Sequence, residues 1–311
     1  MALGAAPAPD SPPAGRAKPL YPVDLLLLGY LSLVSAVALA RTQWSSGGWW
    51  LVGAQTLFVL LLVLVTRPGL GAVGRTLREI YPLLLLVGLY GELDVLNGRG
   101  VATHDPLIQR WEMAVFGAQV SRDWWQSVPS RFWSTVFHGA YFSYYFIVAV
   151  PAFYLVWRDD FRAVRHFVLA VMLSFVACYV VFIFFPVAGP YYEFHRPAGW
   201  FTDNWPARLV YTTLASGSSF GAAFPSSHVA GSVAATLTAA RWSRPLGMAL
   251  VIPTTLLTIG VVYCQMHYGV DALAGLVVGG FGAWWVQHVL DPETGRPRGR
   301  GKLRRYGVTE R

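Results

Sequence analysis

The sequence predicts an all-α, polytopic membrane protein of one domain, and three observations lead to this prediction. Of its 311 residues, 55% are hydrophobic and only 13% are charged, whereas a soluble domain carries about 25% charged residues. Apolar runs recur along the chain, each close to the roughly 20 residues that a membrane helix needs. Positive charges gather in alternate links between these runs. We therefore expect a membrane helix bundle with about eight transmembrane helices.

Eight apolar runs form the expected spans. The third contains Glu92 and Asp94 near one end, where a hydrated helix end is the simpler interpretation of the two acids. Cys178 and Cys264 both fall in apolar runs, so we expect free thiols, with neither a disulfide framework nor a metal cluster. In chain order, the spans cover residues 23–40, 49–66, 80–96, 132–157, 167–186, 228–240, 245–264 and 270–290.

The basic residues predict the orientation of the chain in the membrane. Seventeen of the 24 Lys and Arg residues fall in the two ends of the chain and in the links 67–78, 158–165 and 241–244. An excess of positive charge marks the cytoplasmic side. We therefore expect a disordered cytoplasmic start at residues 1–20 and a basic cytoplasmic tail at 291–311. The net charge of +8 is thus a topology signal, and nucleic acid is not an expected partner.

The link 97–131 contains an expected amphipathic helix. Asp105-Pro106 predicts its start, with Asp105 as the N-cap, and Gly117 predicts its end. One face carries apolar side chains. We expect this helix to lie on the outer membrane interface, as a simple anchor rather than a guide for lipid. The apolar face consists of Leu107, Ile108, Trp111 and Val115.

Two short segments carry residue types suited to catalysis. In CQMHYGVDALAG, His267 and Asp271 are four residues apart, which places them on one face of a helix. A carboxylate there can accept from one imidazole nitrogen and leave the other free as a nucleophile or base. In AAFPSSHVAGS, Ser226, Ser227 and His228 open an apolar helix, and helix starts bind anions.

Each segment alone is explained by local structure, as a helix pair or an N-cap. Both segments, however, fall at the outer ends of their expected spans, so they meet at the extracytoplasmic face. An anion site and two histidines, one backed by an acid, indicate phosphoryl transfer through a phosphohistidine. The expected substrate is a membrane lipid with a phosphate head, because ATP is not available on that side.

FPSSH and HYGVD, one span apart, resemble the type 2 phosphatidic acid phosphatase superfamily. With FFPVAGPYY, they resemble its bacterial branch related to inositol phosphorylceramide synthase. The resemblance implies a phosphatase-like catalytic core at 132–290, preceded by N-terminal helices at 21–131, in a bacterial-type plasma (inner) membrane. It also implies that His267 is the nucleophile, Asp271 orients it, His228 protonates the leaving alkoxide, and Ser226 and Ser227 cradle phosphate. No metal or cofactor is expected.

The chain departs from the family's motifs at three positions. Gly189 stands where the first motif has Lys, Val261 where the third has Arg, and Ser227 where the second has Gly. Two expected cations are therefore missing from the phosphate site. Arg196-Pro197 resembles the end of the first motif. The side chains that could replace the missing charge are Arg196, His195, Arg208 and His138.

An aromatic outer loop favours head-group transfer slightly over simple hydrolysis. Such a surface suits a lipid or alcohol acceptor, with Tyr191, Tyr192 and His138 as possible contacts. Simple dephosphorylation and a non-catalytic lipid-binding protein remain alternatives. The sequence indicates neither the lipid, nor the acceptor, nor the oligomeric state. The aromatic residues are Tyr191, Tyr192, Phe194, Trp200, Phe201, Trp205 and Phe220.

Overall fold

The computed structural model describes residues 19–41, 46–98, 100–217 and 219–290, and within these ranges it is a helical bundle without strands. This confirms the predicted fold class. The predicted basic tail at 291–311 and nearly all of the predicted disordered start lie outside the described residues. The helices are α1 Pro22–Ala40, α2 Ser46–Thr66, α3 Gly71–Leu96, α4 Asp105–Phe116, α5 Val120–Ser127, α6 Arg131–Phe142, α7 Tyr144–Trp157, α8 Phe161–Phe184, α9 Pro190–Glu193, α10 Trp205–Gly217, α11 Ser227–Trp242, α12 Arg244–Tyr263 and α13 Gly269–His288, with a 3₁₀ turn η1 at Gly199–Phe201.

The expected count of eight spans is not confirmed. Within the described ranges, five helices are long and apolar enough to cross a membrane: α1, residues Gly48–Thr66 of α2, α8, α12 and α13. The pair α6 and α7, bent by 42° at Ser143, makes a sixth if it counts as one broken span. Helix α3 carries too many charged residues, and α11 has only 16 residues. Both nevertheless lie where spans were expected.

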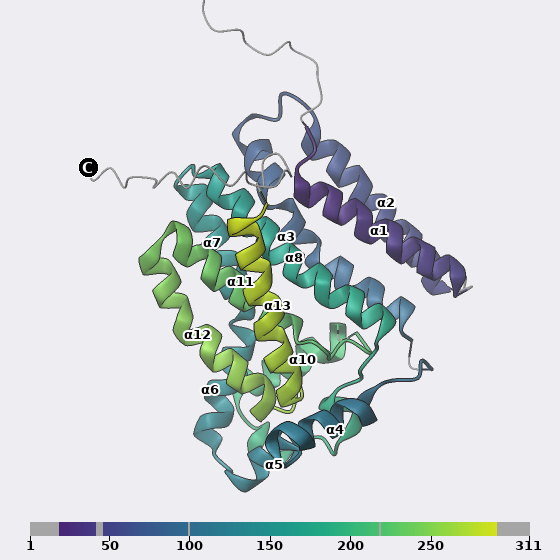
Figure 1. Ribbon diagram of the computed structural model, residues 1–311, viewed down its shortest axis with the longest axis vertical. Helices are drawn as coiled ribbons and strands as arrows, with labels where there is room; N and C mark the ends of the chain where they lie inside the picture. Colours follow the sequence, from purple (N-terminus) through teal and green to yellow (C-terminus); the bar gives the residue numbers. More distant parts are fainter. Residues whose placement is uncertain (1–18, 42–45, 99, 218, 291–311) are drawn as a thin grey trace, which may run out of the picture.

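Helix α11 lies inside the bundle, in contact with α8, α12 and α13 (Figure 1). Small residues allow this close packing, as is common between membrane helices. A Cβ atom added at Gly279 of α13 would lie 2.3 Å from the carbonyl oxygen of Ala230, and one at Gly275 would lie 2.6 Å from that of Ser226. The close approach of α11 and α13 brings the two predicted catalytic segments together.

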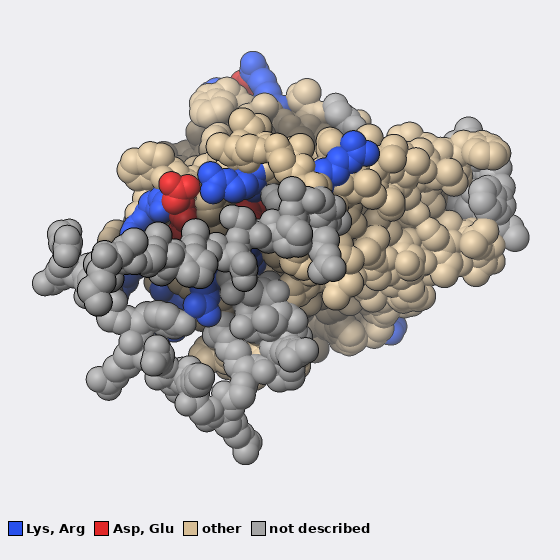
Figure 2. All heavy atoms as spheres, turned by 90° about the horizontal axis from the view of Figure 1, so that it is seen from above, with Lys and Arg blue, Asp and Glu red and all other residues tan. Residues whose placement is uncertain are grey.

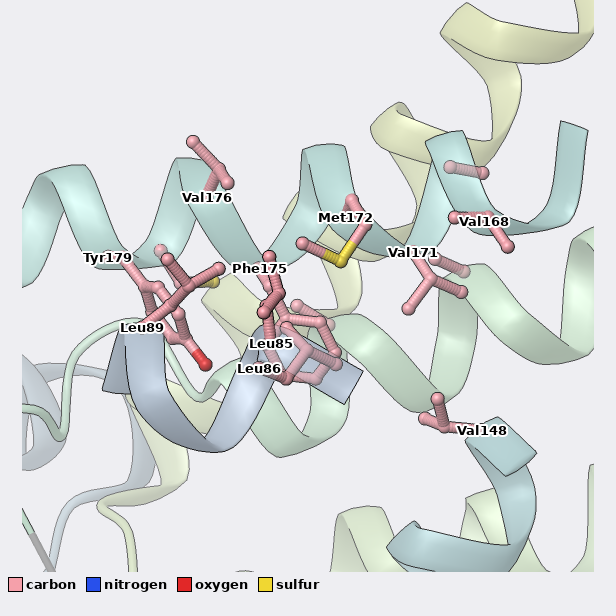
Figure 3. Close-up of a cluster of buried hydrophobic side chains, with 14 of the residues drawn as sticks. Leu85, Leu86, Leu89, Val148, Val168, Val171, Met172, Phe175, Val176 and Tyr179 are labelled. Atoms are coloured by element: carbon pink, nitrogen blue, oxygen red, sulfur yellow. The ribbon is translucent and has the colours of Figure 1, made fainter. Parts of the chain in front are cut away.

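An apolar core joins α3, α7 and α8. Figure 3 shows Leu85, Leu86 and Leu89 of α3 facing Phe175 and Tyr179 of α8. In a bilayer these side chains exchange lipid contacts for protein contacts, so close packing rather than transfer from water stabilises this core. Helices α1 and α2 pack to the side of this core, against α3 and α8 (Figure 1). The core therefore holds α3 against α8, and α8 in turn packs against α11 and α13, which carry predicted catalytic residues.

The two ends of the bundle differ in character. The links 67–70 and 158–160 and residue Ser243 lie at one end, here called the basic end; Figure 2 views this end and shows the Lys and Arg side chains gathered on it. The links 97–130, 185–226 and 264–268, with α4 and α5, lie at the opposite end (Figure 1), here called the site end.

Candidate active site

Two distant backbone segments pair beneath the predicted nucleophile. Val187 and Ala222 form a parallel β-bridge, in which the Val187 amide donates to Gly221 O (3.1 Å) and the Ala223 amide donates to Val187 O (3.0 Å). Gly189 follows with φ +92°, and a Cβ atom there would lie 2.8 Å from that of Ala223. The missing lysine of the first motif would thus strain this turn. The pairing fixes the carbonyl of Ala223.

His267 is buried between α12 and α13 and bonds to that carbonyl. Its Nδ1 lies 2.9 Å from Ala223 O and 3.5 Å from Asp271 Oδ2. A carbonyl can only accept, so Nδ1 carries the proton and Nε2 keeps its lone pair. Burial lowers the pKa of His267 to about 4, which keeps the ring neutral at physiological pH.

The predicted partner Asp271 is therefore the more distant of two groups at Nδ1. Its Oδ2 accepts the amide of Tyr268 at 2.8 Å, as part of a capping box at the start of α13. The carboxylate does lie beside the imidazole, but the predicted common helix face is wrong, because α13 begins at Gly269 and His267 precedes its N-cap. No sequence pattern, however, indicated that Ala223, far along the chain, would supply the shorter hydrogen bond.

The segment Ser226-Ser227-His228 forms the start of α11, as predicted. The ring of His228 lies 5.8 Å from that of His267, centroid to centroid. Ser226 is the N-cap, and its hydroxyl accepts from the Val229 amide (3.4 Å). The first-turn amides of Ser227 and His228 have no acceptor within the helix, which is the usual basis of an anion site.

Two tyrosines that the sequence analysis missed hold His228. Tyr141 and Tyr144 both contact its ring, at centroid distances of 4.9 and 4.8 Å, and the Tyr141 hydroxyl lies 3.4 Å from His228 Nε2. They flank the bend between α6 and α7. The sequence offered one signal for these residues: the tyrosines that follow His138 at the spacing of neighbouring helical turns.

No hydrogen bond or ring contact joins the proposed replacement cations to His267 or His228 in the described part of the chain. Arg196 is exposed and stacks over the ring of Tyr191, 4.3 Å from its centroid, and His195 is also exposed. Arg208 forms an exposed ion pair with Asp203. His138 is fully buried, and its Nδ1 donates to the carbonyl of Ser134 at 2.8 Å.

The aromatic loop is anchored through Gln265, which sequence reasoning also missed. Its amide nitrogen donates to the carbonyls of Pro190 and His195, at 3.2 and 3.0 Å. Tyr191 and Tyr192 contact each other at a centroid distance of 5.1 Å, and Tyr191 lies 6.1 Å from Tyr211 of α10. The acceptor contacts proposed for these residues stay a prediction.

Helix α4 has the predicted bounds, with Gly117 left-handed at its end (φ +70°). The predicted N-cap role of Asp105 is wrong: His104 occupies the N-cap position. The Asp105 carboxylate instead accepts the amides of Ala188 and Gly189, both at 2.8 Å. Helix α4 is therefore bonded to the segment beneath the candidate site as well as lying at the site end.

A cavity of about 640 Å³ opens beside His228. Ser227 and His228 lie on its wall, and most of the remaining wall is apolar or aromatic. Val87 and Tyr145, on the wall, are exposed on the outer surface of the bundle. A second apolar cavity of about 220 Å³ shares Leu86, Val87, Tyr144 and Tyr145 with the first and extends between α3 and α7. The two cavities provide room for apolar chains beside the histidines.

No group of three or more His, Cys, Asp and Glu side chains in the described ranges has the arrangement of a metal site. Cys178 and Cys264 are both free and buried.

The profile of the PAP2 superfamily matches residues 108–285, more than half of the chain. The chain belongs to the PAP2 superfamily. This membership, together with the apolar helices, indicates a multi-pass membrane protein with phosphatase-type activity. The narrower resemblance to the inositol phosphorylceramide synthase branch is not confirmed. No curated protein and no solved structure matches the chain significantly.

Proposed function

We propose that this protein transfers the phosphorylated head group of a membrane lipid to an alcohol acceptor, through a phosphohistidine at His267 on the extracytoplasmic face. The observation that carries the proposal is the state of His267. Its Nδ1 donates to Ala223 O at 2.9 Å, which leaves a neutral Nε2 close to His228. An imidazole fixed in this way is an activated nucleophile.

The separation of the two histidines fits one phosphoryl group between them. Reacting atoms in a bound complex lie about 3–3.5 Å apart. A phosphorus atom between an attacking nitrogen and the leaving oxygen, with a second nitrogen beyond that oxygen, needs rings several ångströms apart. The observed centroid distance is 5.8 Å. The amides of Ser227 and His228 at the start of α11 supply donors to the phosphoryl oxygens.

The proposed reaction has two balanced steps. First, the lone pair of His267 Nε2 attacks phosphorus, the bond from phosphorus to the leaving alkoxide breaks, and His228 gives that oxygen a proton. Buried His228 takes up this proton when the anionic phosphoryl group binds beside it, because a nearby negative charge favours the protonated ring. Second, the acceptor hydroxyl attacks the phosphohistidine, the bond from nitrogen to phosphorus breaks, and neutral His228 takes the hydroxyl proton. Hydrolysis follows the same steps with water as the acceptor.

The cavity supports a lipid substrate, because its wall combines His228 with a largely apolar lining that reaches the outer surface of the bundle. The absence of Lys and Arg at positions 189 and 261 supports a phosphodiester over a monoester, since a diester carries less negative charge. Hydrolysis is the second candidate, favoured by membership of a superfamily with phosphatase-type activity.

The test uses purified protein in lipid nanodiscs with a phospholipid labelled in its phosphate. Candidate alcohol acceptors are added or omitted, and the labelled products are separated. Transfer predicts label in a new phosphodiester only when an acceptor is present. Label that appears only as free phosphate, or as a free phosphorylated head group, with every acceptor supports hydrolysis instead. Turnover by His267→Ala protein equal to wild type would falsify the phosphohistidine mechanism.

Sidedness is tested separately with engineered cysteines, because both native cysteines are buried. A cysteine replacing exposed Ala198, at the site end, should react with an impermeant thiol reagent applied to intact cells. One replacing Gly301 should react only after permeabilisation. The reverse pattern places the site on the cytoplasmic face and removes this part of the proposal.

A further inference from the structure

Helix α4 carries two buried carboxylates that the proposed reaction does not use. Asp105 and Glu112 are fully buried and lie seven residues apart, on one face of α4. Each accepts backbone amides from a segment far away in the sequence. Carboxylates are rarely buried in full unless they are paired or hydrogen-bonded. The groups that bond to Asp105 and Glu112 therefore indicate what each carboxylate does.

Asp105 is linked to one partner of His267. Its two carboxylate oxygens accept the amides of Ala188 and Gly189, at 2.8 Å each. The preceding residue, Val187, pairs with Gly221 and Ala223, whose carbonyl accepts the Nδ1 proton of His267. Asp105 is therefore joined to the nucleophile in three steps. Its carboxylate holds the turn at Gly189, this turn continues the segment paired with Ala223, and the Ala223 carbonyl bonds to His267.

The same carboxylate also reaches the residue next to the nucleophile. The hydroxyl of Tyr268 donates to Asp105 Oδ1 at 3.0 Å and accepts from the Gln109 amide at 3.1 Å. Tyr268 is fully buried and is the N-cap of α13. Asp105 thus bonds both to the turn beside His267's acceptor segment and to the side chain of the residue that follows His267.

Glu112 is linked to the other partner of His267. Its Oε1 accepts the Gly269 amide and its Oε2 accepts the Val270 amide, both at 3.0 Å. These are first-turn amides of α13, which have no acceptor within the helix and which favour a negative charge. The next residue, Asp271, is the one whose carboxylate lies 3.5 Å from His267 Nδ1.

We propose that Asp105 and Glu112 are positioning residues that keep His267 in the Nδ1-protonated form, with Nε2 free. Asp105 acts through the carbonyl of Ala223, and Glu112 acts through the start of α13 and Asp271. The inference rests on the proposed function, because it takes His267 as the nucleophile. Helix α4 therefore contributes to the arrangement of the active site, in addition to the expected role as an interfacial anchor.

The test compares Asp105→Asn and Glu112→Gln with the matched control Asp123→Asn. Asp123 is a partly exposed acid on the neighbouring α5, paired with Arg122. An amide side chain accepts one backbone N–H but opposes the other with its own N–H groups. Each positioning variant should lower kcat about 10- to 100-fold, with KM changed by less than about threefold. The control should match wild type.

A second readout separates positioning from general stability. Nitrogen NMR of ¹⁵N-histidine-labelled, substrate-free protein reports the tautomer of each ring, and the His267 signal is the one lost in His267→Ala. Wild type should show a single Nδ1-protonated form, and the two variants a mixture of both tautomers. A wild-type tautomer in the variants overturns the inference even if kcat falls, as does a kcat equal to that of the control.

If both variants fail to fold, Tyr268→Phe decides. It removes one of three hydrogen bonds to Asp105 and leaves both backbone amides in place. A partial tautomer shift with a smaller loss of kcat is expected, and wild-type values of both overturn the inference. The NMR readout needs no substrate and therefore tests the positioning role by itself. A failure of the proposed function would appear separately, as full turnover by His267→Ala.

Discussion

Carboxylates are buried at both ends of the bundle, but their partners differ. At the basic end, Asp24 pairs with Arg78, and Glu79 pairs with Arg165 at 2.8 Å, which ties α1 to α3 and α3 to α8. At the site end, the carboxylates of α4 accept backbone amides of loops and helix starts. An ion pair fixes two helices against each other, whereas a carboxylate held by amides fixes the path of the backbone.

The difference bears on what the site can bind. Several Arg side chains of the site end have partners other than the histidines: Arg208 and Arg131 pair with Asp203, Arg122 pairs with Asp123, and Arg196 stacks on Tyr191. Positive potential near the histidines therefore comes mainly from backbone amides, such as those at the start of α11. Such a site suits a group with one negative charge better than one with two.

The largest expected effect is the loss of the nucleophile at the site end. His267→Ala should lower turnover of the labelled lipid at least about 10³-fold, because the covalent step loses its attacking atom. His288→Ala, an exposed histidine of α13 at the basic end, is the matched control and should keep wild-type turnover. Equal losses in both variants would show that the two ends do not differ in this way.

At the basic end, the comparison predicts a loss of stability instead. Arg78→Ala leaves Asp24 buried without its charged partner, which costs about 3–5 kcal/mol of unfolding free energy. Turnover per folded molecule should stay within about twofold of wild type, since the pair lies far from the histidines. Unfolding curves in detergent and active-site-normalised turnover measure the two quantities. Arg158→Ala, an exposed arginine at the same end, serves as the control.

Asp271→Asn tests how much the second partner of His267 contributes. The Ala223 carbonyl at 2.9 Å still favours a protonated Nδ1, so the variant should shift only part of the His267 population to the other tautomer, as Glu112→Gln should. The variant loses the negative charge that stabilises positive charge on the ring. We expect a loss of about 10- to 100-fold in kcat, less than for His267→Ala. A loss as large as that of His267→Ala would make Asp271, rather than Ala223, the principal partner.

The sequence predicted the helical fold and the meeting of FPSSH with HYGVD, because both depend on local patterns. Apolar runs give membrane helices, and the PSSH and HxxxD residues each stand at a helix start. The same reasoning failed where one local pattern is compatible with two structures, a continuous span or a broken one, and an irregular link or a short helix. The apolar run 132–157 is broken at Ser143, and the polar link 187–224 contains the helix α10.

The long-range partners of the site could not be predicted from local patterns. Asp105 next to Pro106 has the form of an N-cap, yet its acceptor oxygens are used by Ala188 and Gly189. Ala223 contributes a backbone carbonyl, and any residue type supplies one. Glu112 left a weak signal, because two acids seven residues apart lie on the same face of an amphipathic helix.

A smaller effect is expected where the site end meets the lipid. Thr213 of α10 lies on the wall of the 640 Å³ cavity, and Thr213→Trp would fill part of that space. The chain of a membrane lipid enters the cavity from the bilayer rather than from water, so the variant loses only packing contacts of about 0.1–0.2 kcal/mol each, and KM for a long-chain substrate should rise about two- to fivefold. A short-chain analogue should be less affected. Ala215→Trp, exposed on the same helix and outside the cavity wall, is the control; equal shifts in both variants would contradict a chain-binding cavity.

The smallest expected effect concerns the pH dependence of kcat/KM. It follows from the burial of His267 at the site end. Burial lowers the pKa of His267 to about 4, so the nucleophilic, neutral form persists as pH falls. The kcat/KM for a phosphodiester, whose charge does not change in this range, should therefore decrease less than about twofold through this group between pH 7 and pH 5. An ordinary imidazole, with a pKa of about 6.5, would lose roughly 25-fold over the same interval. The measurement is the acid limb of kcat/KM, with the folded fraction followed by circular dichroism at each pH. An inflection of kcat/KM near pH 6.5 in fully folded protein would show that His267 titrates as an ordinary imidazole. The contrast between the two ends, which takes His267 as a buried neutral ring, would then be wrong.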